Sequence, residues 1–177
     1  QQLRLHMKIF KATRKYEKWL RKELTVFEDD LTLKEQKLKE DRFTFLRGSF
    51  YRWMQLFPDI CKQAADAPVV LAAGDLHAAN FGTWRDAKGQ LVWGVNDFDE
   101  AADLPYTRDL IRLATSALLA PMGCDARSGI EAILNGYAEA LEVRGRPITL
   151  AERHKVVRQM ATERLHNPEE YWDKLRR

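Results

Sequence analysis

The sequence reads GDLHAANFG at residues 74–82 and NDFDE at residues 96–100, so acidic and amide side chains gather in two segments. The first segment follows the apolar run PVVLAA at 68–73, which predicts a buried strand that leads into a loop. Between the segments, the turn sequence DAKG at 86–89 separates two apolar runs and predicts a β-hairpin. The pattern therefore predicts a polar loop and a hairpin that ends in carboxylates.

The spacing of these polar residues is typical of phosphoryl transfer. In that chemistry Mg²⁺, bound by carboxylate and amide oxygens, neutralises phosphate charge, while another carboxylate orients the attacking hydroxyl. Asn80 lies five positions after Asp75, the interval between the catalytic aspartate and the metal-binding asparagine of the kinase loop H-R-D-x-x-x-x-N. Asp97 then matches the aspartate of D-F-G. These residues favour a phosphotransferase site.

The two motifs resemble those of the aminoglycoside and choline phosphotransferase branch of the protein-kinase-like superfamily, H-G-D-x-H-x-x-N and I-D-F/W-D/E. The residues that match are Asp75, His77, Asn80, Asp97 and Asp99. More closely, the chain resembles an uncharacterised bacterial family within that superfamily. The sequences FLRG at 45–48 and RDLIRL at 108–113 add to this closer resemblance, which covers most of the chain.

The resemblance implies a role for each matching residue. Asp75 would be the catalytic aspartate, and His77 is a second catalytic candidate. Asn80 and Asp97 would bind Mg²⁺ and, with it, the phosphates of ATP. Asp99 is a further candidate metal ligand.

Other residues near the motifs have weaker assignments. Arg47 is a candidate for nucleotide binding, because a planar guanidinium suits bidentate contact with phosphate. Asp109 follows Arg108 in an apolar run, so we expect its carboxylate to be largely buried and to need donors such as loop amides or Arg108. The resemblance implies that Asp109 supports the catalytic loop through backbone hydrogen bonds.

Each role has a structural alternative that the sequence leaves open. Asp75 and Asn80 are also residue types that satisfy the backbone of their own turn. The acidic residues 97–100 could simply close the hairpin. His77 could instead fix its loop by a hydrogen bond to a neighbouring carbonyl. Arg47 could instead form a structural salt bridge.

The sequence departs from the phosphotransferase pattern in two ways. Ala73 stands where that pattern has the histidine of H-G-D. No glycine-rich strand pair and no strand lysine precede Gly74, where a kinase has its nucleotide-binding lobe. We therefore expect the chain to be a fragment of a longer protein, with an incomplete nucleotide site.

The predicted fold is α+β and mainly helical, resembling the C-terminal lobe of a kinase with a small β-hairpin at the active site. We expect one domain over residues 1–177, with a helical region at 1–67, the catalytic loop and metal-binding hairpin at 68–101, and a second helical region at 102–177. The predicted helices are Leu5–Leu24, Leu31–Leu46, Phe50–Ile60 capped by Ser49, Asp109–Leu119, Ile130–Leu141 ending near Gly145, and Leu150–Leu165 capped by Thr149.

Composition limits the remaining function classes. With 45% hydrophobic residues and a net charge of +3 over 177 residues, the chain is typical of a folded domain and carries no broad nucleic-acid footprint. No apolar run approaches the roughly 18 residues that span a bilayer, so we expect no membrane partner and a cytoplasmic location. The oligomeric state is not indicated.

We therefore expect transfer of a phosphoryl group from ATP, with Mg²⁺, to a hydroxyl of a small-molecule acceptor. The main alternative is a non-catalytic kinase-like module that binds a ligand or regulates a partner. A third possibility is metal-assisted hydrolysis by the same carboxylates.

Overall fold

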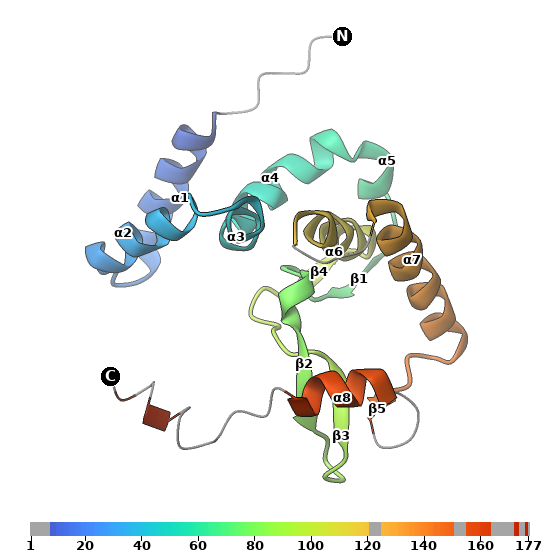
Figure 1. Ribbon diagram of the computed structural model, residues 1–177. Coiled ribbons are helices and arrows are strands. Elements are labelled where there is room, and N and C mark those ends of the chain that lie inside the picture. The colour runs from blue at the N-terminus through green and yellow to red at the C-terminus, as the bar shows by residue number, and fades with distance from the viewer. Residues whose placement is uncertain (1–7, 121–124, 151–154, 164–171, 174–175, 177) are drawn as a thin grey trace. The chain divides into compact units, whose positions relative to one another are not determined.

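The computed structural model of the chain describes residues 8–120, 125–150, 155–163, 172–173 and 176 (Figure 1). The chain divides into two compact units, of which the first comprises residues 1–78 and 98–134 and the second residues 79–97 and 135–177. The described residues form helices with small antiparallel sheets, so the predicted mainly helical α+β class is confirmed. Within them, no helix combines the length and the apolar character needed to cross a membrane.

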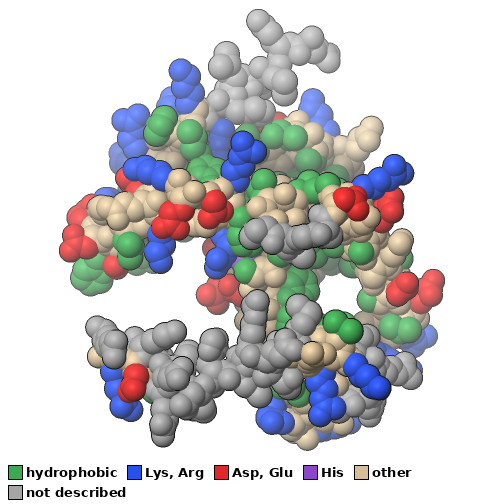
Figure 2. All heavy atoms as spheres, in the orientation of Figure 1, with side chains coloured by type: hydrophobic (Ala, Val, Ile, Leu, Met, Phe, Trp, Pro, Cys, Tyr) green, Lys and Arg blue, Asp and Glu red, His purple; other side chains and the backbone are tan. Residues whose placement is uncertain are grey.

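Helices precede the first strand of the first unit. They are α1 Ile9–Glu23, α2 Glu28–Lys37, α3 Arg42–Gly48, α4 Phe50–Ile60 and α5 Lys62–Ala65. The α2 helix carries acidic residues in its first turn and lysines in its last, and Figure 2 shows side chains of both charges over α1 and α2. This mixture of charges is in keeping with the small net charge of +3.

Two details of the helical region differ from the prediction. The continuous helix predicted for Leu31–Leu46 is wrong, because α2 ends at Lys37 and Asp41 begins a new helix as its N-cap, accepting a hydrogen bond from Thr44 N at 2.8 Å. Ser49 does precede α4, but its hydroxyl donates to Phe45 O at 2.6 Å instead of capping that helix.

The strand before the loop is exposed, which contradicts the predicted buried strand. Strand β1, Val69–Ala72, pairs antiparallel with β4, Ala102–Pro105. Because the sheet has these two strands alone among the described residues, most of β1 stays uncovered: Leu71 is 78% exposed and Ala72 only 4%. Pairing of Ala72 with Ala102 nevertheless fixes where the loop begins.

Helix α6, Thr107–Leu119, completes the part of the first unit that carries the loop. It contacts α3 and α5. Helix α7, Ala126–Glu142, follows, and Gly145 closes its end with φ +63° and a hydrogen bond to Ala140 O at 2.8 Å. The predicted helix end near Gly145 is thus confirmed.

The second unit contains the hairpin. Strands β2, Phe81–Arg85, and β3, Leu91–Val95, pair antiparallel as predicted, and β5, Ile148–Thr149, extends the sheet beside β3. The carboxylate of Asp86 accepts hydrogen bonds from Lys88 N and Gln90 N in the turn, at 2.9 and 2.8 Å.

The end of the second unit was predicted less well. Thr149 lies in β5, and Leu150 is 2% exposed and donates its N–H to Leu91 O, so the helix predicted to start at Leu150 is wrong at its first residue. Residues 151–154 lie outside the described part, and α8 runs over Lys155–Glu163. The η1 turn, Ala78–Asn80, leads into β2.

Candidate functional site

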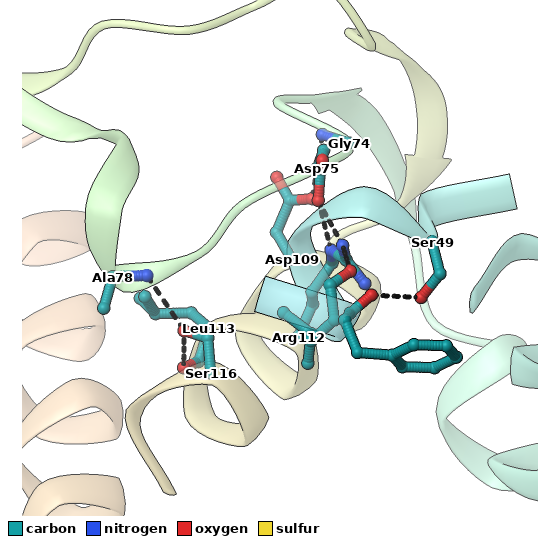
Figure 3. Close-up of polar contacts among 10 residues, drawn as sticks. Ser49, Gly74, Asp75, Ala78, Asp109, Arg112, Leu113 and Ser116 are labelled. Atoms are coloured by element: carbon teal, nitrogen blue, oxygen red, sulfur yellow. Dashed lines mark hydrogen bonds and ion pairs between the residues drawn. The ribbon is translucent and has the colours of Figure 1, made fainter. Parts of the chain in front are cut away.

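Helix α6 carries three polar residues, Asp109, Arg112 and Ser116, that contact the loop after β1 (Figure 3). Their spacing of three and four positions puts them on one face of a helix. The two buried residues of α6, Arg112 and Ser116, are both polar. The most deeply buried residues of α6 therefore belong to this polar face.

Asp109 fixes the start of the loop. Its two carboxylate oxygens accept hydrogen bonds from Ala73 N at 2.7 Å and from Gly74 N at 3.0 Å. The prediction that Asp109 holds the loop through backbone amides is confirmed. These bonds satisfy the backbone amides of Ala73 and Gly74. They hold the start of the loop, where Ala73 replaces the histidine of the phosphotransferase motif.

Arg112 is the largest fully buried side chain in the described part of the chain, at 1% exposure. Its Nε donates to Asp75 Oδ1 at 2.6 Å and its Nη2 donates to Leu46 O at 2.8 Å. The guanidinium lies over the rings of Phe50 and Trp53, at 5.2 and 5.5 Å. Because a buried charge needs a partner, the ion pair with Asp75 ties this loop to α6.

Ser116 fixes the far end of the loop. It is fully buried, its Oγ accepts a hydrogen bond from Ala78 N at 2.9 Å, and it donates to Leu113 O at 2.7 Å. The loop is therefore attached to α6 at its start, at Asp75 and at its end.

Gly74 is the point of closest backbone approach. Its φ is +86°, and a Cβ placed on it would lie 2.1 Å from Glu100 O. A residue with a side chain would meet both a disfavoured conformation and backbone atoms. Glycine is thus required for the loop to pass Glu100 next to the β1–β4 ladder.

Asp75 remains accessible despite its ion pair, since 22% of its side chain is exposed. It lines a pocket of about 500 Å³ in the first unit, together with Arg47 and Glu100. Arg47 is exposed, and its guanidinium lies 6.0 Å from the centre of the Phe43 ring. The predicted nucleotide role of Arg47 stays a prediction, but its side chain and the Asp75 carboxylate do line one cavity.

His77 is 5% exposed and packs edge-on against Phe43, with ring centres 6.1 Å apart. A histidine this deeply buried in the loop favours the structural alternative over proton transfer at the surface. The catalytic role of His77 stays a prediction.

The predicted metal ligands fall in both units. In the second unit, Asn96 N donates to Asn80 O at 2.9 Å, which brings Asn80 to the hairpin end that Asp97 follows. Asn80 is 3% exposed, whereas Asp97 is exposed. Asp99 belongs to the first unit, where a turn bonds Ala101 N to Phe98 O.

The predicted Mg²⁺ site at the hairpin end stays a prediction. That ion is usually held by one or two carboxylates together with phosphate and water oxygens, and Asn80 and Asp97 supply an amide and a carboxylate. Across the described ranges, no group of three or more His, Cys, Asp or Glu residues is placed to hold a metal. A metal at the hairpin would therefore depend on the amide and on ligand oxygens.

The ionisation of Asp109 gives a testable pH dependence. Burial raises its pKa, against the opposing effects of the Ala73 and Gly74 amides and of Arg112. A carboxyl with a raised folded-state pKa contributes stability below its unfolded pKa of about 4, and this contribution is lost as the pH rises through the folded value. We expect the free energy of unfolding of the wild type, minus that of Asp109→Asn, to fall over this window in urea titrations.

Asp125→Asn is the matched control of opposite sign. Hydrogen bonding to Ser128 lowers the pKa of Asp125, so its contribution is present above the unfolded pKa and lost as the pH falls. A wild-type minus Asp109→Asn difference that instead rises with pH would mean that the amide hydrogen bonds outweigh burial.

A family model described as "Uncharacterized protein conserved in bacteria (DUF2252)" matches residues 27–172. The match includes the loop, the hairpin and α6. The chain belongs to the DUF2252 family. No curated protein and no solved structure matches the sequence significantly. The resemblance to an uncharacterised bacterial family is confirmed, and the link of DUF2252 to kinase-like proteins stays a prediction.

The roles of Arg112 and Ser116 in this DUF2252 member were not predicted from the sequence. The motif at 108–113 contains Arg112, but its apolar neighbours suggest an ordinary core helix. A signal was present: the polar residues at 109, 112 and 116 are three and four positions apart, the spacing of residues that share one helical face.

Proposed function

We propose that this chain carries the catalytic loop and metal-binding hairpin of a kinase-like phosphotransferase, dependent on ATP and Mg²⁺, that acts on a hydroxyl of a small molecule, with a nucleotide site that is incomplete in this chain. The observation that supports it best is the position of Asp75. Contacts from α6 fix the loop and its carboxylate, yet 22% of the Asp75 side chain stays exposed in a pocket of small-molecule size. A carboxylate fixed in advance orients a reacting hydroxyl without further ordering cost.

The order of elements supports a kinase-like lobe. Strands β1 and β4 pair with each other, and the loop, the hairpin and Asp97 lie between them in sequence. This is the order in which kinases present their catalytic loop and metal-binding aspartate. Asp109, which binds the loop amides, adds a support that the resemblance implied.

In this proposal each residue has one task. Asp75 orients the acceptor hydroxyl and accepts its proton. Asn80 and Asp97 hold Mg²⁺, which would neutralise charge on the transferred phosphoryl group. Arg47, on the pocket wall, contacts phosphate or acceptor oxygens.

One observation favours the alternative, a module that binds ligands without turnover. The Asp75 carboxylate is paired with the buried guanidinium of Arg112. A carboxylate stabilised in its charged form by a nearby cation is a weaker proton acceptor. Binding and transfer therefore have to be measured separately.

The proposal predicts that Asp97→Asn weakens binding of Mg-ATP at least about tenfold, because a metal ligand is lost. Calorimetric titration of the wild type and the variant measures this. Asp103→Asn, an exposed carboxylate on β4, is the control and should bind as the wild type does. Mg-ATP binding that is equal in the wild type and in Asp97→Asn would contradict the proposal. Absence of Mg-ATP binding in the wild type would favour the non-catalytic module for this chain, as expected for an incomplete nucleotide site.

Asp75→Asn separates enzyme from module. If the site transfers phosphate, this variant binds Mg-ATP but loses acceptor-dependent ADP formation. If the wild type binds Mg-ATP and forms no ADP with any hydroxyl compound of a broad panel, the module is the better description.

A further inference from the structure

The pocket beside Asp75 has one aromatic wall, built between α1 and α4. The rings of Tyr16 and Tyr51 are stacked, with centres 4.3 Å apart and planes 8° from parallel. Thr13 Oγ1 and Tyr51 OH lie at hydrogen-bond distance, 2.7 Å, and tie the two helices together. Trp19 lies 5.7 Å from Tyr16 and is 52% exposed. The wall is thus formed in advance and suits a flat apolar group.

Two cations line the same pocket. Lys34 Nζ lies 5.6 Å from the centre of the Tyr16 ring, and the Arg47 guanidinium 6.0 Å from that of Phe43. Both cationic groups thus lie near aromatic rings. Asp41 caps α3 and does not line the pocket. Hydrogen bonds to Thr44 are the main cause of its lowered pKa, and the charge of Arg47 makes only a small contribution.

The carboxylates of the pocket do not balance these cations. Asp75 and Glu100 are the acidic residues of its lining. The charge of Asp75 is already matched by Arg112, which is buried behind it. Glu100 is then the remaining carboxylate of the lining, against the two cations Lys34 and Arg47, so the local excess is positive. A positive, concave and partly apolar surface attracts anions.

We propose that this pocket binds an acceptor that joins a flat apolar body to an anionic group, a carboxylate or a phosphate, recognised by Lys34 and Arg47. The apolar body lies along Tyr16 and Tyr51. The assignment of the bound molecule as an acceptor, with its hydroxyl at Asp75, rests on the proposed phosphotransferase function. The preference for anions does not depend on that function. This charge is opposite to that of the amine-bearing acceptors, aminoglycosides and choline, of the resembling phosphotransferases.

The test uses probes that share one body and differ in charge: para-hydroxyphenylpropanoate, para-hydroxyphenyl phosphate and tyramine. Each is titrated into the wild-type chain by calorimetry without nucleotide or metal. We expect the better anion to bind about tenfold more tightly than tyramine, as two partly exposed ion pairs would give. Which anion binds better tells a carboxylate site from a phosphate site.

Variants assign the preference to the two cations. Lys34→Gln and Arg47→Gln should each reduce it about threefold, and the double variant should abolish it. Lys37→Gln, an exposed lysine on α2 that does not line the pocket, should leave it unchanged. Circular dichroism of each variant checks that the helices remain.

Three results would overturn the proposal: a preference for tyramine, an anion preference that survives in the double variant, or no saturable binding of any probe. The Mg-ATP titration on the same samples keeps the two proposals apart. An anion preference that needs Lys34 and Arg47 stands even if Mg-ATP does not bind, and Mg-ATP binding stands even if the probes fail.

Discussion

Replacing Gly74 with alanine is expected to lower the free energy of unfolding by about 3 kcal/mol or more. The backbone of Gly74 has φ +86°, and an added Cβ would lie 2.1 Å from the carbonyl oxygen and 2.8 Å from the carbonyl carbon of Glu100. Both are backbone atoms next to β4, so no side-chain rotation relieves the clash. Urea denaturation followed by circular dichroism measures the loss.

Gly89→Ala is the matched control. Gly89 has a similar φ of +76°, but nothing lies within 4 Å of its added Cβ. It should show the cost of the left-handed backbone alone, about 1 kcal/mol. If Gly74→Ala costs no more than Gly89→Ala, the close approach of the loop to Glu100 is not a feature of the folded protein in solution.

Replacing Arg112 with methionine is expected to cost about 3 kcal/mol or more, the range for removing one partner of a buried ion pair. Methionine occupies much of the space between Phe50 and Trp53, so the loss reports chiefly on the bonds to Asp75 and Leu46 O. Because Asp75 is partly exposed, water can rehydrate its carboxylate and keep the cost near the lower end. Urea titration again measures the difference.

Arg127→Met is the control for losing an arginine. Arg127 is 88% exposed and pairs with Glu131 one helical turn away, so its removal should change stability by no more than about 0.5 kcal/mol. A double-mutant cycle with Asp75→Asn isolates the ion pair and should give a coupling of about 1 kcal/mol or more. If Arg112→Met leaves the free energy of unfolding unchanged, the attraction within the ion pair only offsets the cost of removing its charges from water.

The features predicted correctly from the sequence are those set by nearby residues. The turn at 86–89 defines a hairpin because Asp86 bonds amides two and four positions ahead. Gly145 ends α7 because glycine adopts the left-handed conformation readily. For Asp109, the need of a carboxylate in an apolar helix for donors left loop amides and Arg108 open, and the resemblance implied the loop amides.

The features predicted wrongly depend on distant neighbours. Apolar residues in β1 suggest burial, but burial requires a covering layer, and β4 pairs only with the strand edge. Likewise, periodicity at 31–46 continues across a point where Asp41 starts a second helix.

Part of the candidate site also lay beyond sequence reasoning. The partner of Arg112 is 37 positions away, so the helix alone does not reveal it. Membership of the family and the motif residues were accessible from the sequence, whereas the pocket and its charges required the packing of α1 to α4.

The polar face of α6 also fixes how that helix is turned. A rotation by one residue, about 100°, would carry Asp109, Arg112 and Ser116 away from their three partners together. Apolar neighbours such as Leu110 and Leu113 tolerate several rotational settings of the helix, because dispersion contacts have little directionality. Hydrogen bonds are directional, so the polar residues tolerate only one setting. The loop thus fixes the rotation of α6 about its own axis. The same residues that position Asp75 select one packing of α6 from the many that apolar contacts alone would allow.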